Sequence, residues 1–205
     1  MSEGINLFEV FSAVTGALQD NKRNLNKADS YNQNHGDNMV QIFELITKAT
    51  QEKKDEKPAR QLDYAADLVN KATQSGSAQV YVQGLQNAAK EFTGSNISLE
   101  SIVPLIQMLL GGGKSSSGTG GDLLGSLLGG LGGVDADDDG LDMGDLLNAG
   151  LSFMNAKDDG DSNLEALAEV LVSNTAIGQS DSSHRAQSGQ VVAKTVMQLL
   201  ANLGK

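Results

Sequence analysis

The chain has 205 residues, enough for one domain with a sizeable core, and its formal net charge of −11 argues against nucleic acid and anionic membranes as partners. The absence of cysteine excludes disulfides, thiolate metal ligands and a cysteine nucleophile. No apolar run is long enough to span a membrane and no basic leader is present, so we expect a cytoplasmic protein.

Apolar residues then recur at helical spacing, segment after segment, with polar connections between them. The first predicted helix covers residues 6–22, and a polar connection follows. Asp37 or Asn38 is the expected cap of the second helix, whose apolar residues run from 39 to 49. Pro58 suits the start of the third helix, and a fourth, residues 78–92, follows the break at residues 75–77. A fifth helix is capped by Ser98 or Ser101.

The composition changes after residue 110. Residues 111–133 consist mostly of glycine, serine and leucine, which is typical of a flexible linker. Its leucine pairs are expected to cover part of the body, to meet a partner or to self-associate, so a homo-oligomer is possible. Further helices are predicted at residues 143–153, from residue 164, and at residues 188–203. The sequence therefore predicts eight principal helices and no strand.

An acidic stretch follows the linker. Asp135, Asp137 and Asp139 place carboxylates at alternate positions before Gly140, as at the start of a calcium loop. The position of the closing glutamate holds Leu146, so a shorter, atypical loop would be needed to bind Ca²⁺. The alternative, a solvated acidic turn, is favoured by the missing ligand.

Three polar loops each precede a helix: residues 27–38, 75–77 and 178–187. If successive helices are antiparallel, the second, fourth and last helices begin at the same end of the molecule. Backbone amides and helix dipoles at these N-termini would favour an anion such as phosphate.

The motif His35-Gly36-x-Asn38-Met39 at a helix start resembles the ATP-binding (DhaL-type) domain of dihydroxyacetone kinases, and the related domain of fatty acid kinases. Residues 76–84 are similar to the glycine-rich segment of that family, and His184 with the final helix is similar to its late Gly-His segment. The resemblance covers most of the chain except about residues 111–142.

The resemblance implies an all-α fold, an antiparallel eight-helix barrel, with residues 1–205 as one domain and residues 111–142 as an insertion. It implies ADP or ATP held through Mg²⁺ at one end, and a protein partner such as a substrate-binding kinase subunit. The cofactor-binding positions would be His35, Gly36, Asn38, Met39, Ser75, Gly76, Ser77 and His184.

The sequence departs from the family at the metal site. Asn32 and Asn34 stand where the family has its two motif aspartates, and Mg²⁺ prefers anionic oxygen ligands. Asp29 or Asp37 could substitute, although neither is at a family position. In the late segment, Ala186 and Gln187 replace the family's Asp-Pro pair.

These departures favour a degenerate relative that has weak or no magnesium-dependent catalysis, acts with a partner and has no assigned catalytic residue. One alternative is an active ATP-binding subunit of a dihydroxyacetone- or fatty-acid-kinase-like system. Another is a non-enzymatic helical module that binds an apolar ligand or a protein. Taken singly, Asn38 could be only a helix cap, His35 an exposed loop residue and His184 a solvated loop histidine.

Overall fold

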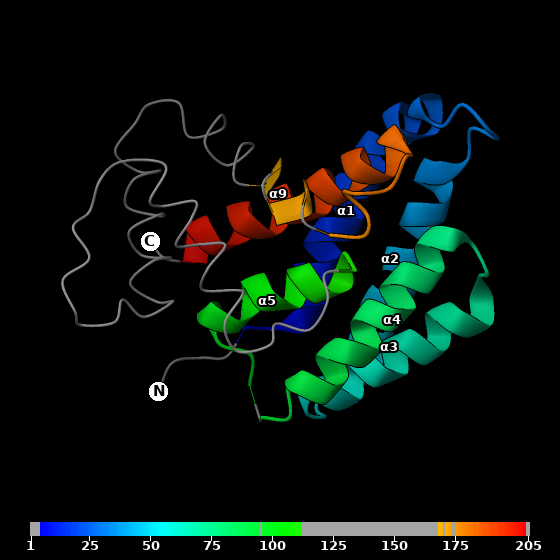
Figure 1. The fold of residues 1–205 in the computed structure, drawn as a ribbon. Helices are drawn as coiled ribbons and strands as arrows, with labels where there is room; N and C mark the ends of the chain where they lie inside the picture. Colours follow the sequence, from blue (N-terminus) through cyan, green and yellow to red (C-terminus); the bar gives the residue numbers. More distant parts are fainter. Residues whose placement is uncertain (1–4, 95, 112–167, 170, 174, 204–205) are drawn as a thin grey trace, which may run out of the picture.

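The computed structural model of the chain describes residues 5–94, 96–111, 168–169, 171–173 and 175–203. This part of the chain is all-helical, which confirms the predicted all-α class (Figure 1). Its named helices are α1 (Leu7–Ala28), α2 (His35–Glu52), α3 (Pro58–Ala72), α4 (Gly76–Glu91), α5 (Leu99–Leu109) and α9 (Ser183–Leu203). In the same part, no helix is long and apolar enough to cross a membrane. The helix predicted at residues 143–153 lies outside the described residues.

Neighbours in sequence are mostly neighbours in space. α1 packs between α9 and α2, and α2, α3, α4 and α5 then follow by pairwise contact (Figure 1). α2 also contacts both α4 and α9, which makes it the most connected of the described helices. The first turn of α2 is therefore placed to meet segments far away in the sequence.

The core is built from the apolar stripes of these helices. Phe43 of α2 lies at its centre, with its ring 6.4 Å from that of Phe11 in α1 and 5.1 Å from that of Tyr81 in α4. All three side chains are buried, and the Phe43 and Tyr81 rings meet edge to face at 77°. An isolated antiparallel bridge between Ile5 and Ile97 adds a backbone hydrogen bond of 2.8 Å.

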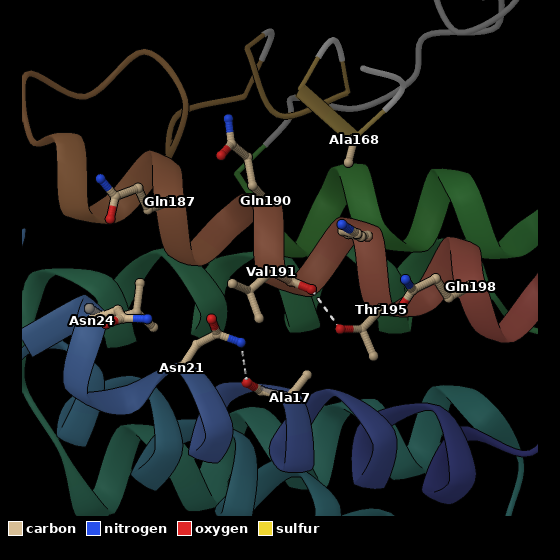
Figure 2. Close-up of a pocket in the computed structure, with 11 residues that line it drawn as sticks. Ala17, Asn21, Asn24, Ala168, Gln187, Gln190, Val191, Thr195 and Gln198 are labelled. Carbon is tan, nitrogen blue, oxygen red and sulfur yellow. Dashed lines mark hydrogen bonds between the residues drawn. The ribbon is translucent and has the colours of Figure 1, made fainter. Parts of the chain in front are cut away.

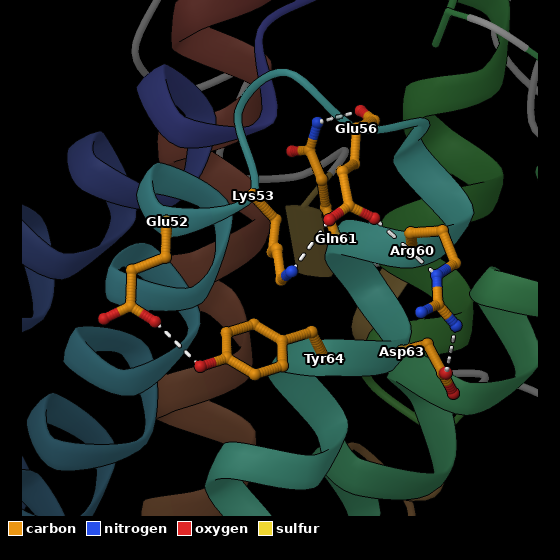
Figure 3. Close-up of polar contacts among 7 residues, drawn as sticks. All are labelled: Glu52, Lys53, Glu56, Arg60, Gln61, Asp63 and Tyr64. Atoms are coloured by element: carbon orange, nitrogen blue, oxygen red, sulfur yellow. Dashed lines mark hydrogen bonds and ion pairs between the residues drawn. The ribbon is translucent and has the colours of Figure 1, made fainter.

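Polar contacts fix the turn between α2 and α3 (Figure 3). Gln61 is buried and donates from Nε2 to the carbonyl oxygen of Glu56 at 2.8 Å. On the exposed side, Lys53 pairs with Glu56, and the Tyr64 hydroxyl donates to Glu52 at 2.8 Å. The turn is therefore held by one partly buried hydrogen bond and by exposed contacts around it.

Three helices differ from the prediction by three or more residues at one end. α1 continues to Ala28, because Leu25 is buried in the core and extends the apolar stripe past the polar residues that seemed to end it. α2 begins at His35, so Asn38 lies inside the helix and the prediction that it or Asp37 is the cap is wrong. α9 begins at Ser183, five residues before the predicted start at residue 188.

The end of α5 is hydrogen-bonded to the segment at residues 176–177. Gly111 has a φ of +78°, a conformation that favours glycine, and its carbonyl accepts a hydrogen bond from the amide of Ala176 at 3.3 Å. The amide of Ile177 donates to Leu110 at 3.2 Å. Apart from Gly111, the predicted insertion at residues 111–142 lies outside the described residues.

Candidate functional site

The loop before α2 is organised by one carboxylate. Asp29 follows the end of α1, is only 4% exposed, and accepts hydrogen bonds from the amides of Tyr31 at 3.0 Å and Asn34 at 3.3 Å. Gln33 takes a left-handed φ of 56° between these two anchors, a conformation that costs about 1 kcal/mol in a residue other than glycine. Asp29 therefore holds the chain in the tight turn that delivers it to the start of α2.

The Asp29 carboxyl stays ionised despite its position. Burial raises its pKa, but hydrogen bonds from the backbone of Tyr31, Asn34 and Asn32, and the nearby His184, together lower the pKa below its ordinary value. The oxygens of Asp29 already accept hydrogen bonds from the loop amides, so few of their lone pairs remain for a ligand.

The first turn of α2 contacts the first turns of α9. His35 is 4% exposed, its Nε2 lies 3.0 Å from Oγ of Ser188, and its ring centroid lies 4.5 Å from that of His184. The Ser188 hydroxyl donates its proton to the carbonyl of Arg185 at 2.8 Å. Because that hydroxyl has a single proton, it accepts from His35, and we assign the His35 proton to Nε2.

His35 is neutral at neutral pH. Burial is the main cause that lowers its pKa to about 4, and the charges of His184 and Arg185 lower it further, against a raising effect of Asp29. The distance between His35 Nε2 and Ser188 Oγ is typical of a catalytic base and its serine nucleophile, but the other features of the pair are not. Ser188 is buried and gives its proton to a carbonyl, and His35 Nε2 is already protonated, so proton removal from Ser188 is not prepared.

The start of α4 joins the same cluster through Arg185. A Cβ placed on Gly76, the first residue of α4, would lie 2.6 Å from Nη2 of Arg185, so the guanidinium lies directly against this helix N-terminus. Among the described residues, the guanidinium has no hydrogen-bond or ion-pair partner. The N-termini of α2, α4 and α9 therefore meet around His35, Gly76, His184 and Arg185, as the three polar loops predicted.

The remaining predicted cofactor positions fall into two groups. Ser75 caps α4 by accepting from the amide of Ala78 at 3.1 Å, and Ser77 is buried beside it. Met39 is fully buried in the core. Asn38 donates from Nδ2 to Oδ1 of Asn34 at 2.9 Å.

Gly36 has a packing role. A Cβ there would collide with the carbonyl oxygen of Lys22 in α1 and lie 2.9 Å from Oδ1 of Asn26. Gly36 thus lets the start of α2 approach the backbone of α1, which brings His35 to its place. Its requirement for glycine comes from this helix contact.

The residues at the predicted metal positions do not fit a magnesium cage. Asn32 and Asn34 are exposed amides, and Asn34 Oδ1 already accepts from Asn38. The Asp37 carboxylate accepts from Asn26 at 2.7 Å and pairs with Lys22 at 3.2 Å, and these contacts lower its pKa. No group of three or more acidic, histidine or cysteine residues placed to hold a metal occurs in the described part of the chain. The acidic stretch with Asp135, Asp137 and Asp139 lies outside it.

Arg185 is the site residue that the sequence interpretation missed. The sequence pattern predicts a loop at this position, whereas Arg185 lies in the first turn of α9, with its charge at the meeting point of the helix starts. Its position beside His184, at the start of the final amphipathic stretch, was the available signal. The two histidines, expected as exposed loop residues when taken singly, contact each other instead.

Comparison with known proteins adds no relative: no protein-family model, no curated protein and no solved structure matches the chain.

Proposed function

We propose that this chain is a degenerate DhaL-like helical domain that binds a phosphate-bearing ligand weakly, without a magnesium cage, and acts together with a protein partner. The observation that carries the proposal is the meeting of three helix N-termini around a guanidinium that has no partner among the described residues. Helix N-termini and an arginine fork both favour phosphate oxygens.

The charges of the cluster suit an anion of this kind. His35 is neutral, and the ionised Asp29 carboxylate is held by loop amides, so Arg185 is the cation at the meeting point that has no hydrogen-bond or ion-pair partner among the described residues. In a magnesium-dependent site, carboxylates would hold the metal and the metal would hold the phosphates. Here Asp29 and Asp37 are engaged in holding the loop and α1, and we assign the contact with phosphate to Arg185 and the helix amides.

The proposal includes the eight-helix barrel and leaves out the active-kinase alternative. The sequence of pairwise contacts from α9 through α1 to α5 is compatible with an antiparallel barrel, which we include in the proposal. The active-kinase alternative needs anionic metal ligands, but Asp29 and Asp37 beside the loop are already engaged, and the described residues contain no group of three or more acidic, histidine or cysteine residues placed to hold a metal. We therefore assign no phosphoryl-transfer step to this chain.

Titration calorimetry with ADP tests the proposal directly. We expect weak binding that is the same with and without Mg²⁺, and we expect Arg185→Gln to weaken it by about tenfold, the loss of one charge-assisted contact. Arg60→Gln, on the exposed face of α3, is the matched control and should leave ADP binding unchanged. Tight, magnesium-dependent binding to the wild type would overturn the proposal.

A second experiment tests the alignment with the family. Asn32→Asp combined with Asn34→Asp restores the two motif carboxylates, and we expect this variant to gain magnesium-dependent ADP binding. If the variant gains none while it keeps the wild-type melting temperature, the residues of the loop are not equivalent to the family motif.

A further inference from the structure

A second surface differs in chemistry from the cluster around Arg185, because side-chain amides line it. A cleft of about 390 Å³ lies between α1 and α9 (Figure 2). Asn21 and Asn24 line it from α1, and Gln187, Gln190, Lys194 and Gln198 line it from α9. We call this surface the amide cleft.

The amides of the cleft follow the helical repeat. The α9 residues of the amide cleft are spaced by three, four and four positions, so they form one row along the helix. Figure 2 shows Gln187, Gln190 and Gln198 in succession along α9, with Asn21 and Asn24 on the neighbouring α1. At a rise of about 1.5 Å per residue the row is about 16 Å long, which equals about five residues of extended chain.

The hydrogen-bonding groups of this row are unused. Within the described part of the chain, the amides of Asn24, Gln187, Gln190 and Gln198 have no partner, and neither does the ammonium group of Lys194. Asn21 donates to its own helix at Ala17, and its amide oxygen remains available. Gln190, Lys194 and Gln198 are half-buried. Apolar side chains would also be suited to such half-buried positions, yet these three residues are polar.

The charge of the cleft is opposite to that of the chain. The protein carries a net charge of −11, yet none of the described residues that line the amide cleft is acidic, and Lys194 is its one charged residue. An acidic ligand is therefore not repelled locally. An amide both donates and accepts, which matches the alternating N–H and C=O groups of an extended main chain.

We propose that the amide cleft binds an extended, acidic peptide segment of a partner protein, held through its main chain by the amide row and through an acidic side chain by Lys194. The length of the row, its donor and acceptor pattern and its charge all fit that occupant. The proposal is independent of the anion site, because none of its residues belongs to the cluster around Arg185.

Selection from a display library of short random peptides against the full chain tests this proposal. We expect enrichment of sequences that contain Asp or Glu. The enriched peptides are then synthesised, and their binding is measured by fluorescence anisotropy. Gln190→Ala combined with Gln198→Ala should weaken this binding by at least about tenfold, because two hydrogen bonds are lost. Lys194→Gln should remove the dependence of binding on salt concentration.

Matched variants separate the cleft from general effects. Gln41→Ala combined with Gln83→Ala makes the same chemical change at exposed positions of α2 and α4 and should leave peptide binding unchanged. Arg185→Gln should also leave it unchanged, so failure here is distinguishable from failure at the anion site. The proposal is overturned if no acidic sequence is enriched, if the Gln190/Gln198 variant binds as well as wild type at an equal melting temperature, or if maltotriose binds the cleft and peptides do not.

Discussion

At the scale of single residues, the cluster at the start of α2 combines three ionisable side chains that differ in charge and in bonding partners. Asp29 is ionised and held by amides, His35 is buried and neutral, and Arg185 is charged and unpaired among the described residues. The three groups differ because each meets a different neighbour: backbone N–H groups, a serine hydroxyl, or the start of α4. In the function that we propose, Arg185 contacts the ligand, because among these three groups it is the one without a partner in the described part of the chain.

The buried His35 predicts how stability depends on pH. Its pKa is about 4 in the folded protein and about 6.5 in the unfolded chain, so between these values the unfolded chain binds a proton that the fold excludes. The free energy of unfolding should therefore fall as pH decreases from about 6.5 to about 4 and should lose this dependence below that range. Urea denaturation at several pH values measures it.

His35→Gln removes the titrating group and is the control. Its stability should change less with pH in the same window, whatever its absolute value. Asp29 and Asp37 have lowered pKa values, so their contributions are lost only below the ordinary range of a carboxyl and do not account for this window. An equal slope in wild type and variant would show that His35 is not excluded from protonation in the fold.

At the scale of elements, the sequence predicted the type of the helices and not where they begin. The stripes of α1, α3 and α5 identify helices because apolar spacing is set by the core that they cover. The first turns of α2 and α9 are polar and held by distant partners such as Ser188 and Lys22. No local signal encodes those partners, so the sequence placed the starts too late, and with them the position of Arg185.

The contact between α1 and α2 predicts a large effect of one methyl group. Gly36→Ala would press its Cβ on the carbonyl oxygen of Lys22, and we expect a loss of about 1–3 kcal/mol in the free energy of unfolding. Gly16→Ala is the matched change within α1, where nothing lies within 4 Å of the new Cβ. It should instead stabilise by about 0.5–1 kcal/mol, because alanine favours the helix. Equal effects of the two substitutions in urea denaturation would contradict the described approach of the helices.

At the scale of the whole molecule, charge is unevenly distributed along the chain. Residues 112–167 contain 11 of the 26 acidic residues and two of the 15 basic ones, so they carry nine of the eleven net negative charges. The rest of the chain, which includes the described helices, is nearly neutral. The acidic character read from composition is therefore a property of one segment, and it does not forbid an anion site elsewhere.

Removal of the hydroxyl group should change the free energy of unfolding in opposite directions at Tyr81, which is buried in the core, and at Tyr64, whose hydroxyl makes an exposed contact. The Tyr81 hydroxyl is fully buried, which raises its pKa, and it has no hydrogen-bond partner in the described part of the chain, whereas the Tyr64 hydroxyl donates to Glu52. Tyr81→Phe should raise the free energy of unfolding by about 1 kcal/mol, because it removes a buried polar group that has lost its water. Tyr64→Phe should lower it by less than about 1 kcal/mol, since that hydrogen bond is exposed. If Tyr81→Phe destabilises the protein, its hydroxyl has a partner in solution.

The meeting of α2, α4 and α9 also bears on how such a site can change over evolutionary time. Its positive potential arises partly from the direction in which the chain runs through these helices, and a side-chain substitution cannot reverse that direction. Side-chain substitutions therefore leave this contribution to the potential in place. Under the function that we propose, the exchange of Asn32 and Asn34 for aspartates in one loop would change metal dependence while the helical scaffold is preserved.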